Sequence, residues 1–581
     1  MARLMRKTVR GHEYWYAVES KRVNGNPRIV WQRYLGKMDD IIARCLQGPG
    51  AYDVIVYEFG AVAAVLSIAQ RLGLEAIIDR HVPKGQQEVA VGRYLLLAAI
   101  NRVVAPRSKA QIGAWYERTV LRRLWGLPAH HFTSQRFWQA MDRVDVAAIE
   151  AIEFDLVRAA IAEFGVEVRG LIYDATNFFT YVNTRTNAEL PQRGHNKQKR
   201  NDLRQVNLAL LAAADGHVPL LHATYPGNVP DCKAFEQVSA RLVARCRAVA
   251  AEDTDVTLVF DKGNNSQTNL DRVAREHLHF VSSLVPSQHK DVLAIPKVAY
   301  REVDPARWPG LLAHRVGRKV YGVERTVLAT FNPHLCEGQL QGLRSQRQRI
   351  EVGLQALQAK LQRWTDSPPP RGKKPTPEGT SRLVSRLLRG REPGPYLRYE
   401  VTADASGLVQ LSYRWDDDGM QAMIDLYFGK TLLFTDRSDW SDEQIVAAYR
   451  SQAKIEDAFK QMKDPHFVSW RPLLHWTDQK VQVHAAYCVF ALLLSALLHR
   501  EVRRADPHLA PAFDTLMESL AQIQGVIDIP RGGDRKRTVP VSIRLTRRDP
   551  DQERLFQLLG LQHFHPEVAK PAPSETTGTT P

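Results

Sequence analysis

The segment Val166-Glu-Val-Arg-Gly-Leu-Ile-Tyr-Asp174 marks the point where the spacing of apolar residues changes from that of helices to that of strands. Before it, apolar residues recur at helical spacing from Phe59 to Phe164. After it, two further strands are predicted at 205–211 and 218–224, and Asp215-Gly216 between them is typical of a hairpin turn. A sheet is therefore expected to begin at this segment.

The elements predicted after the hairpin alternate between helix and strand. They are a helix at 231–249, a strand at 256–260, a helix at 266–278 and a strand at 279–284. The strand at 256–260 has one polar residue, Thr257, which favours burial on both faces. The order strand, strand, strand, helix, strand, helix, strand is that of the ribonuclease H-like fold, so an α/β core of this kind is expected.

The rest of the chain is too long to belong to the same hydrophobic core, because the sequence has 581 residues. A β-hairpin with basic and aromatic strands is predicted from Glu13 to Leu35, with its turn at Asn24-Gly25-Asn26-Pro27, and it could lie on DNA. We expect a small basic β-hairpin region at 1–50, a helical DNA-binding amino-terminal domain at 51–164, a catalytic domain at 165–284 and 435–500, a largely β insertion subdomain at 285–434, and a basic carboxy-terminal region with a disordered tail at 501–581.

The composition favours a polyanionic partner, because the formal net charge is +16 and the pI is about 9.6. Nucleic acid is the first candidate. The five cysteines are scattered without a CxxC pair, which excludes a zinc finger and fits a reducing cytoplasm. The longest apolar run, Ala485 to Leu498, is shorter than the ~20 residues that a bilayer requires, so we expect a buried helix and no membrane contact.

Two aspartates directly follow predicted strands. Asp174 stands where the first apolar strand is expected to end, and Asp261 follows the strand at 256–260. Ligands of α/β sheets collect beyond the carboxyl ends of the strands, so two acids arriving there can share a cation. Either aspartate could instead cap the turn after it, and Lys262-Gly263-Asn264-Asn265 supplies such a turn for Asp261.

A third acid lies on a helix whose start is well specified. Ser441-Asp442-Glu443-Gln444 is a capping box, with Trp440 and Ile445 as its hydrophobic staple. Counted from there, one stripe faces the core (Ala448, Ile455, Phe459, Met462), and a second lies beside it (Tyr449, Gln452, Glu456, Lys463). Glu456 therefore borders the buried face, where a carboxylate costs desolvation energy unless it is paired. A magnesium ion shared with the two aspartates would offset that cost. A surface salt bridge from Glu456 to Lys460 is the alternative.

This helix resembles the signature of a known family, the insertion-sequence DDE transposases, which carry Tyr-x-x-Arg-x-x-x-Glu-x-x-x-x-x-x-Lys. Tyr449, Glu456 and Lys463 match it, and Gln452 stands where the family has Arg. Four other segments are similar to that family: Tyr173-Asp174-Ala-Thr176, Gly194-His195-Asn-Lys197 through to Gln205, Gly227-Asn228-Val-Pro-Asp231, and Phe260-Asp261-Lys-Gly263-Asn. The similarity covers about 165–485, with an insertion where these transposases carry one.

The resemblance implies a DDE transposase with Asp174, Asp261 and Glu456 as its catalytic and metal-binding residues. Such an enzyme uses two Mg²⁺ ions, for which Mn²⁺ can substitute, cleaves the DNA at the ends of its insertion sequence, and joins the 3′-hydroxyl ends to target DNA. It also implies double-stranded DNA as the partner, an insertion subdomain that touches element-end DNA, a homodimer on paired ends, and a cytoplasmic location at the bacterial nucleoid.

DNA-binding residues are expected at two places. On the helix they are Tyr449, Gln452 and Lys463; because Gln452 brings no charge, Arg450 and Lys454 are candidates to replace the missing Arg. Near the first strands a dense basic group is expected to contact phosphates, with a solvated charged loop as the alternative: Arg193, His195, Lys197, Lys199, Arg200 and Arg204.

Two other functions stay open at the level of sequence. A ribonuclease H-like nuclease would cut structured DNA or RNA without strand transfer. A catalytically inactive, transposase-derived DNA-binding protein could retain all three acids. Joining of precut ends separates the first from a transposase, and magnesium-dependent nicking separates the second.

Overall fold

The computed structural model describes residues 2–9, 12–23, 26–46, 52–182, 187–196, 198–248, 255–367, 373–530 and 542–565. The chain folds into two compact units, each assembled from segments distant in sequence. The first consists of Met1–Ser67, Gly113–His131 and Asp506–Pro581, and the second of Ile68–Ile112 and Phe132–Ala505.

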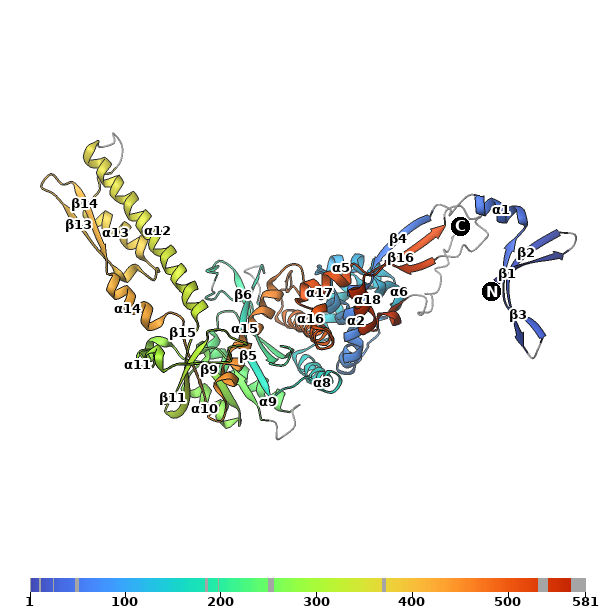
Figure 1. The fold of residues 1–581 in the computed structure, drawn as a ribbon, viewed down its shortest axis with the longest axis horizontal. Helices are drawn as coiled ribbons and strands as arrows, with labels where there is room; N and C mark the ends of the chain where they lie inside the picture. The colour runs from blue at the N-terminus through green and yellow to red at the C-terminus, as the bar shows by residue number, and fades with distance from the viewer. Residues whose placement is uncertain are drawn as a thin grey trace. The chain divides into compact units, whose positions relative to one another are not determined.

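A nine-stranded sheet organises the second unit (Figure 1). From edge to edge its strands are β10 (Arg301–Glu302), β11 (Leu312–Val320), β12 (Val323–Phe331), β15 (Lys430–Thr435), β9 (His279–Ser283), β8 (Thr257–Val259), β5 (Gly170–Thr180), β6 (Arg204–Ala213) and β7 (Pro219–Pro226).

The strands β5 to β9 have the expected ribonuclease H-like topology. β5, β6 and β7 form an antiparallel meander, and β8 and β9 run parallel to β5. Helix α9 (Asp231–Arg247) leads from β7 to β8, and α10 (Gln267–Arg275) leads from β8 to β9. The predicted turn between β6 and β7 is also present, and both Gly216 and His217 adopt positive φ there, at 64° and 56°. The predicted fold class is confirmed.

The insertion between β9 and β15 is tied into this same sheet. After α11 (Lys290–Leu293), β10, β11 and β12 extend the sheet, and β12 pairs antiparallel with β15. The remainder, which we call the arm (333–428), contains α12 (Pro333–Asp366), α13 (Pro377–Leu388), β13 (Leu397–Ala403), β14 (Val409–Trp415) and α14 (Asp417–Tyr427). The expected strands are therefore present, together with more helix than a largely β subdomain would contain.

Helices enclose the rest of the second unit: α3 (Leu74–His81), α4 (Val91–Val104), α7 (Ser134–Asp142), α8 (Val146–Phe164), α15 (Asp442–Lys463) and α16 (Asp478–Ala505). Helix α16 packs against α4, α8 and β7. Within the described ranges it is the one helix that alone is long and apolar enough to cross a membrane, but 89% of its apolar window is buried inside the protein. It is the buried helix predicted from the apolar run at 485–498.

The first unit contains two three-stranded antiparallel sheets. One has the order β1 (Ala2–Val9), β2 (His12–Val23), β3 (Asn26–Gly36), which confirms the predicted hairpin strands and adds β1. The other has the order β17 (Ser542–Leu545), β16 (Gln524–Pro530), β4 (Tyr52–Glu58). The turn residues Asn24 and Gly25, the basic stretch 531–541 and the polar tail from 566 onward lie outside the described residues.

Helices complete the first unit: α1 (Met38–Leu46), α6 (Val120–Trp125), α17 (Phe513–Ala521) and α18 (Pro550–Leu558). Two more helices, α2 (Gly60–Leu72) and α5 (Lys109–Glu117), begin in one unit and end in the other. The helical spacing from Phe59 to Phe164 is therefore confirmed, and these helices divide between the two units.

Candidate active site

The pairing of β5 with β8 brings two predicted acids to the same level of the sheet. In this parallel pair Ile172 lies opposite Val259, and Asp174 and Asp261 each follow two residues later. The backbone of Asp261 is still extended, with φ −79° and ψ 157°. Because side chains two residues apart on an extended chain point to the same side, the two carboxylates leave the sheet on the same face.

The strand does not end at Asp174, as the sequence suggested. β5 continues to Thr180 because it stays hydrogen-bonded to β6, and Asp174 lies opposite Leu210 in that pair. What ends before Asp174 is the pairing with β8, which is only three residues long. Asp174 therefore stands at the edge of the parallel part of the sheet, where the predicted site requires it.

Asp261 precedes a short 3₁₀ turn, η2 (Lys262–Asn264), without capping it through its side chain. The alternative in which Asp261 serves only to cap the following turn is therefore not what the structure contains. Asp174 is more constrained, because its Oδ1 accepts a hydrogen bond from the backbone N–H of Ala175 at 2.8 Å.

The third acid, Glu456, is positioned by helix α15, whose predicted start is confirmed. The Ser441 hydroxyl accepts from the Gln444 N–H, and the Gln444 side chain accepts from the Ser441 N–H, so the capping box is complete. Ile455, Phe459 and Met462 are buried, as the predicted core stripe requires. Burial of this stripe fixes the rotation of the helix about its axis, and with it the direction of Glu456.

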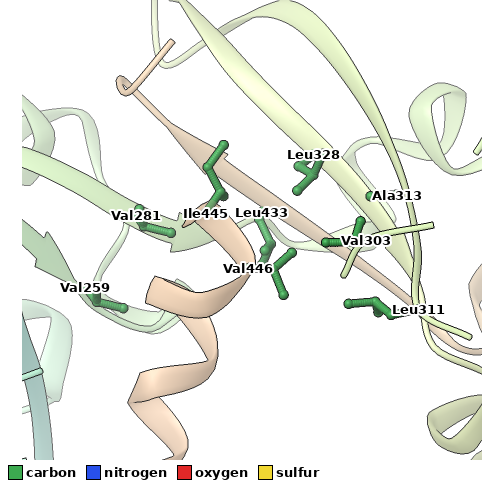
Figure 2. Close-up of a cluster of buried hydrophobic side chains, with 9 residues drawn as sticks. All are labelled: Val259, Val281, Val303, Leu311, Ala313, Leu328, Leu433, Ile445 and Val446. Atoms are coloured by element: carbon green, nitrogen blue, oxygen red, sulfur yellow. The ribbon is translucent and has the colours of Figure 1, made fainter. Parts of the chain in front are cut away.

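An apolar cluster holds the first turns of α15 against the sheet. Ile445 and Val446 pack among Val259 of β8, Val281 of β9 and Leu433 of β15, as Figure 2 shows, with Trp440 against the same cluster. β8, which Asp261 follows, therefore also contacts the start of α15, the helix that contains Glu456, as do β9 and β15. The position of the third acid depends on long-range packing as well as on the local helix.

A single cleft of about 560 Å³ is lined by all three predicted acids. Its other lining residues come from β5, the loop after β5, β6, the loop after β7, η2 and α15: Ala175, Thr176, Asn177, His195, Asn196, Gln198, Asn207, Gly227, Asn228, Val229, Pro230, Gly263, Asn264, Gln452, Phe459, Lys460 and Lys463. Glu456 is exposed, and Lys460 forms its ion pair with Asp457 at 2.8 Å. Lys460 therefore pairs with Asp457, and not with Glu456 as the alternative interpretation expected.

The remaining residues of the second stripe take different places. Gln452 is buried, at 8% exposure, and lines the cleft. Lys463 also lines it, and its Nζ donates to the Thr176 hydroxyl at 2.6 Å, two residues from Asp174. Arg450 packs its guanidinium 5.4 Å from the Trp308 ring centre and is not among the cleft-lining residues, so it does not replace the missing Arg there.

Tyr449 stands beside the cleft rather than in its lining. Its hydroxyl donates to the Ser283 hydroxyl at 3.0 Å, which joins α15 to β9. Burial raises the pKa of Tyr449, and the negative charges of Asp261 and Glu456 raise it further. Tyr449 therefore lies close enough to both acids to feel their charges.

The basic residues predicted near the first strands lie on the loop before β6, except Arg204, which is the first residue of β6. Arg193, Lys199 and Arg200 are exposed, and Arg200 forms an ion pair with Asp202, at 2.8 Å between Nη2 and Oδ2. Arg204 is partly buried and donates to the carbonyl of Pro191 at 3.1 Å. Lys197 lies outside the described residues.

This loop is held against the cleft by a buried glutamine. Gln205 Nε2 donates to the carbonyls of Gly227 at 2.8 Å and His195 at 3.2 Å. Gly227 has no space for a side chain, since a Cβ there would lie 2.0 Å from the Gln205 carbonyl oxygen. His195 and Asn196 thus form a fixed wall of the cleft.

Sequence reasoning did not assign a site role to Asn228 or Asn264, and it grouped His195 only with the basic residues expected to contact phosphates; all three line the cleft. His195 and Asn228 fall in segments that carried the family resemblance, which was the available signal. Asn264 follows Asp261 within a turn and was interpreted only as part of that turn. The contacts that bring these residues together are long-range, so spacing along the chain does not reveal them.

The donor atoms of the cleft suit a hard divalent cation, which prefers carboxylate and amide oxygens. The acids Asp174, Asp261 and Glu456 supply carboxylates, and Asn264 adds an amide whose Oδ1 is buried without a hydrogen-bond partner among the described residues. In the described ranges, no group of three His, Cys, Asp or Glu side chains is already arranged to hold a metal ion. The chemistry of the donors fits a cation, and closure around one would require the acids to move together.

Comparisons with known proteins gave one family match and one similar solved structure. The sequence model of the family described as "Transposase DDE domain" matches residues 169–494, more than half of the chain. Among solved structures, the chain is similar to piggyBac transposase in a synaptic complex with hairpin DNA, at 8% sequence identity, with 79% of each chain covered and a TM-score of 0.37. No curated protein sequence matches significantly.

Proposed function

The chain belongs to the transposase DDE domain family, and on that premise we propose that it cleaves DNA at the ends of its insertion sequence and joins the freed 3′-hydroxyl groups to target DNA. The observation that carries this proposal is the common cleft lined by Asp174, Asp261 and Glu456, which arrive from β5, the end of β8 and α15. The family match covers all three of these positions.

We further propose that these three acids bind two divalent ions, Mg²⁺ with Mn²⁺ as a substitute, since enzymes of this family generally use divalent metal ions. When bound, the ions would activate the attacking water or 3′-hydroxyl and stabilise the leaving oxygen. The contribution of the protein is to hold carboxylate oxygens at one level of the sheet and to bring Glu456 to them from α15.

Cationic and amide groups around the acids would position the DNA strand. Lys463, held by Thr176 beside Asp174, is suited to a backbone phosphate. Gln452 can donate hydrogen bonds from the same wall, without the charge of an arginine. The exposed Arg193, Lys199 and Arg200, with Lys197 and Arg204 near them in the sequence, would contact duplex phosphates outside the cleft, and paired ends would be held by a homodimer.

The first prediction tests the three acids. Asp174→Ala, Asp261→Ala and Glu456→Ala are each expected to abolish Mg²⁺-dependent nicking of a labelled element end, while binding of that end persists in a gel-shift assay. Asp457→Ala is the matched control for Glu456→Ala, because Asp457 is the next residue on α15 and pairs with Lys460 on the surface. Nicking retained by one of the three variants removes that residue from the site.

The same assay separates the other functions. A nuclease without strand transfer would nick the end but leave a precut 3′-hydroxyl end unjoined to a target plasmid. An inactive DNA-binding descendant would shift the end in a gel and give no product in Mg²⁺ or Mn²⁺. The proposed function requires both nicking and joining, and EDTA should stop both.

A further inference from the structure

The turn that follows Asp261 is held rigidly by hydrogen bonds on both sides. The Asn264 N–H donates to the Asp261 carbonyl at 3.0 Å, and the Asn264 carbonyl accepts from Asn269 Nδ2 at 2.7 Å. Asn265 Nδ2 donates to the Ser283 carbonyl at 2.7 Å, and Asn265 Oδ1 accepts from the Ser282 hydroxyl at 2.9 Å. Both backbone groups of Asn264 are therefore anchored without using its side chain.

The side chain of Asn264 is the exception in this network. Asn264 is buried, at 5% exposure, and lines the cleft with the three acids. Its Oδ1 is fully buried and, among the residues that the structure describes, has no hydrogen-bond partner. A buried acceptor without a partner destabilises the folded protein, so a residue of this kind is expected where the oxygen serves a ligand.

A second asparagine of the same cleft shows the ordinary arrangement. Asn207 is equally buried, at 5% exposure, and its Nδ2 donates to the carbonyls of Pro226 at 3.2 Å and Val229 at 3.1 Å. Those bonds tie the loop after β7 to β6, a structural role. Asn207 is not among the side chains with an unpartnered buried oxygen, whereas Asn264 Oδ1 has no hydrogen-bond partner in the part of the chain that the structure describes.

We propose that Asn264 supplies a further oxygen ligand for the divalent cation held by the three acids, an inference that rests on the proposed function. Amide oxygens are hard ligands of the kind that Mg²⁺ and Mn²⁺ accept beside carboxylates. Asn264 lies three residues after Asp261 on an anchored turn, so its amide accompanies that carboxylate in any movement that closes the site. The added donor is neutral, which strengthens coordination without adding repulsion among the acids.

The test measures Mn²⁺ binding to the metal-free full-length protein without DNA, by the electron paramagnetic resonance signal of free Mn²⁺. Asn264→Leu has nearly the same shape and no oxygen; it is expected to weaken Mn²⁺ binding at least tenfold while the melting temperature of the metal-free protein stays equal or rises. Asn264→Asp restores an oxygen and should bind Mn²⁺ at least as tightly as the unsubstituted protein. Asn101→Ala is the matched control, because Asn101 is a buried asparagine outside the cleft lining whose side chain bonds to the Ala105 carbonyl and the Arg107 N–H; it should lower the melting temperature and leave Mn²⁺ affinity unchanged.

The possible results distinguish failure of the ligand role of Asn264 from failure of the proposed function. Unchanged Mn²⁺ affinity in Asn264→Leu, together with loss in Asp261→Ala, overturns the inference and leaves the acids in place. No Mn²⁺ binding by the unsubstituted protein overturns the proposed metal chemistry, and the inference with it. If Asn264→Leu does not fold, an Asn264→Asp variant with weakened Mn²⁺ binding still refutes the ligand role.

Discussion

His217, in the turn between β6 and β7, ties the stability of the fold to pH. Burial, together with the smaller effect of the positive charge of Lys454 on α15, lowers the pKa of His217 to about 4, against the opposing effect of Asp215 and Asp457. In the unfolded chain a histidine titrates near 6.5, so the unfolded state takes up the proton first as the pH falls. The stabilising contribution is therefore complete above about pH 6.5 and is lost between about pH 6.5 and 4, at a cost of about 3 kcal/mol.

A His217→Asn variant should lose less stability than the unsubstituted protein when the pH falls from 7 to 4, because it lacks this proton-binding group. Asparagine tolerates the positive φ of 56° at this position better than most residues. The measurement is the free energy of unfolding in urea at several pH values in this range. Parallel stability curves for the two proteins would show that His217 does not control the acid transition.

The sequence predicted single residues well where their role is local. Asp174 and Asp261 could be selected because each follows a run of apolar residues in the sequence, and both line the cleft. Asn264 could not be selected, because what distinguishes it is an oxygen left without a partner after residues far along the chain have satisfied its neighbours. The identification of the three acids as catalytic stays a prediction until the substitutions are made.

At the scale of elements, one hydrogen bond couples α15 to β9. The Tyr449 hydroxyl donates to Ser283, and the bond spans 166 residues of sequence. Ser283→Ala leaves the buried Tyr449 hydroxyl without its partner, so it should cost about 1–3 kcal/mol of stability. Tyr449→Phe removes the same bond from the other side, and the double variant should lose less than the sum of the two single losses.

Urea unfolding of the four proteins measures this coupling. Ser495→Ala is the matched control, because the buried Ser495 hydroxyl donates to the Leu492 carbonyl within α16. This variant should show no coupling to Tyr449→Phe. Strict additivity of Ser283→Ala and Tyr449→Phe would mean that the bond does not hold the helix. A Ser283→Thr variant keeps the hydroxyl and should recover part of the stability.

The contrast within α15 explains what could be predicted for an element. The capping box and the core stripe depend on residues a few positions apart, so the start and the buried face of the helix followed from sequence alone. The bond to Ser283 and the apolar cluster with Val259 and Val281 depend on the sheet order, which no local pattern encodes. For the same reason the sequence indicated an early end for β5, whose continued pairing with β6 is a long-range contact.

At the scale of the whole molecule, the sequence indicated an insertion before the helix with Glu456 but not that its strands β10, β11 and β12 extend the central sheet. Phe331 of β12 pairs with Lys430 of β15, and the Asn332 N–H donates to the Gly429 carbonyl at 2.7 Å. The two ends of the arm therefore meet at the end of an antiparallel strand pair. The arm also has apolar clusters of its own, one around Ile350 and Leu354 and one around Met420 and Phe428.

Replacing the arm (333–428) by an Asn-Gly turn should convert β12 and β15 into a simple hairpin, because that dipeptide suits a two-residue connection. The shortened protein is expected to unfold cooperatively in urea and to bind Mn²⁺ as tightly as the full chain, while its affinity for element-end DNA falls. Circular dichroism, Mn²⁺ titration and gel shifts measure these properties. A shortened protein without a cooperative transition would show that the arm is needed for the core to fold.

The meeting of the arm's two ends has a consequence for how such a protein can change over generations. Insertions, deletions or exchanges of coding sequence between residues 332 and 429 change the arm. The pairing of β12 with β15 at its two ends is unaffected. The cleft with the three acids and the arm are thus encoded by separable stretches of the gene. On the proposed function, changes in the arm could alter which DNA the protein contacts while the three acids stay the same.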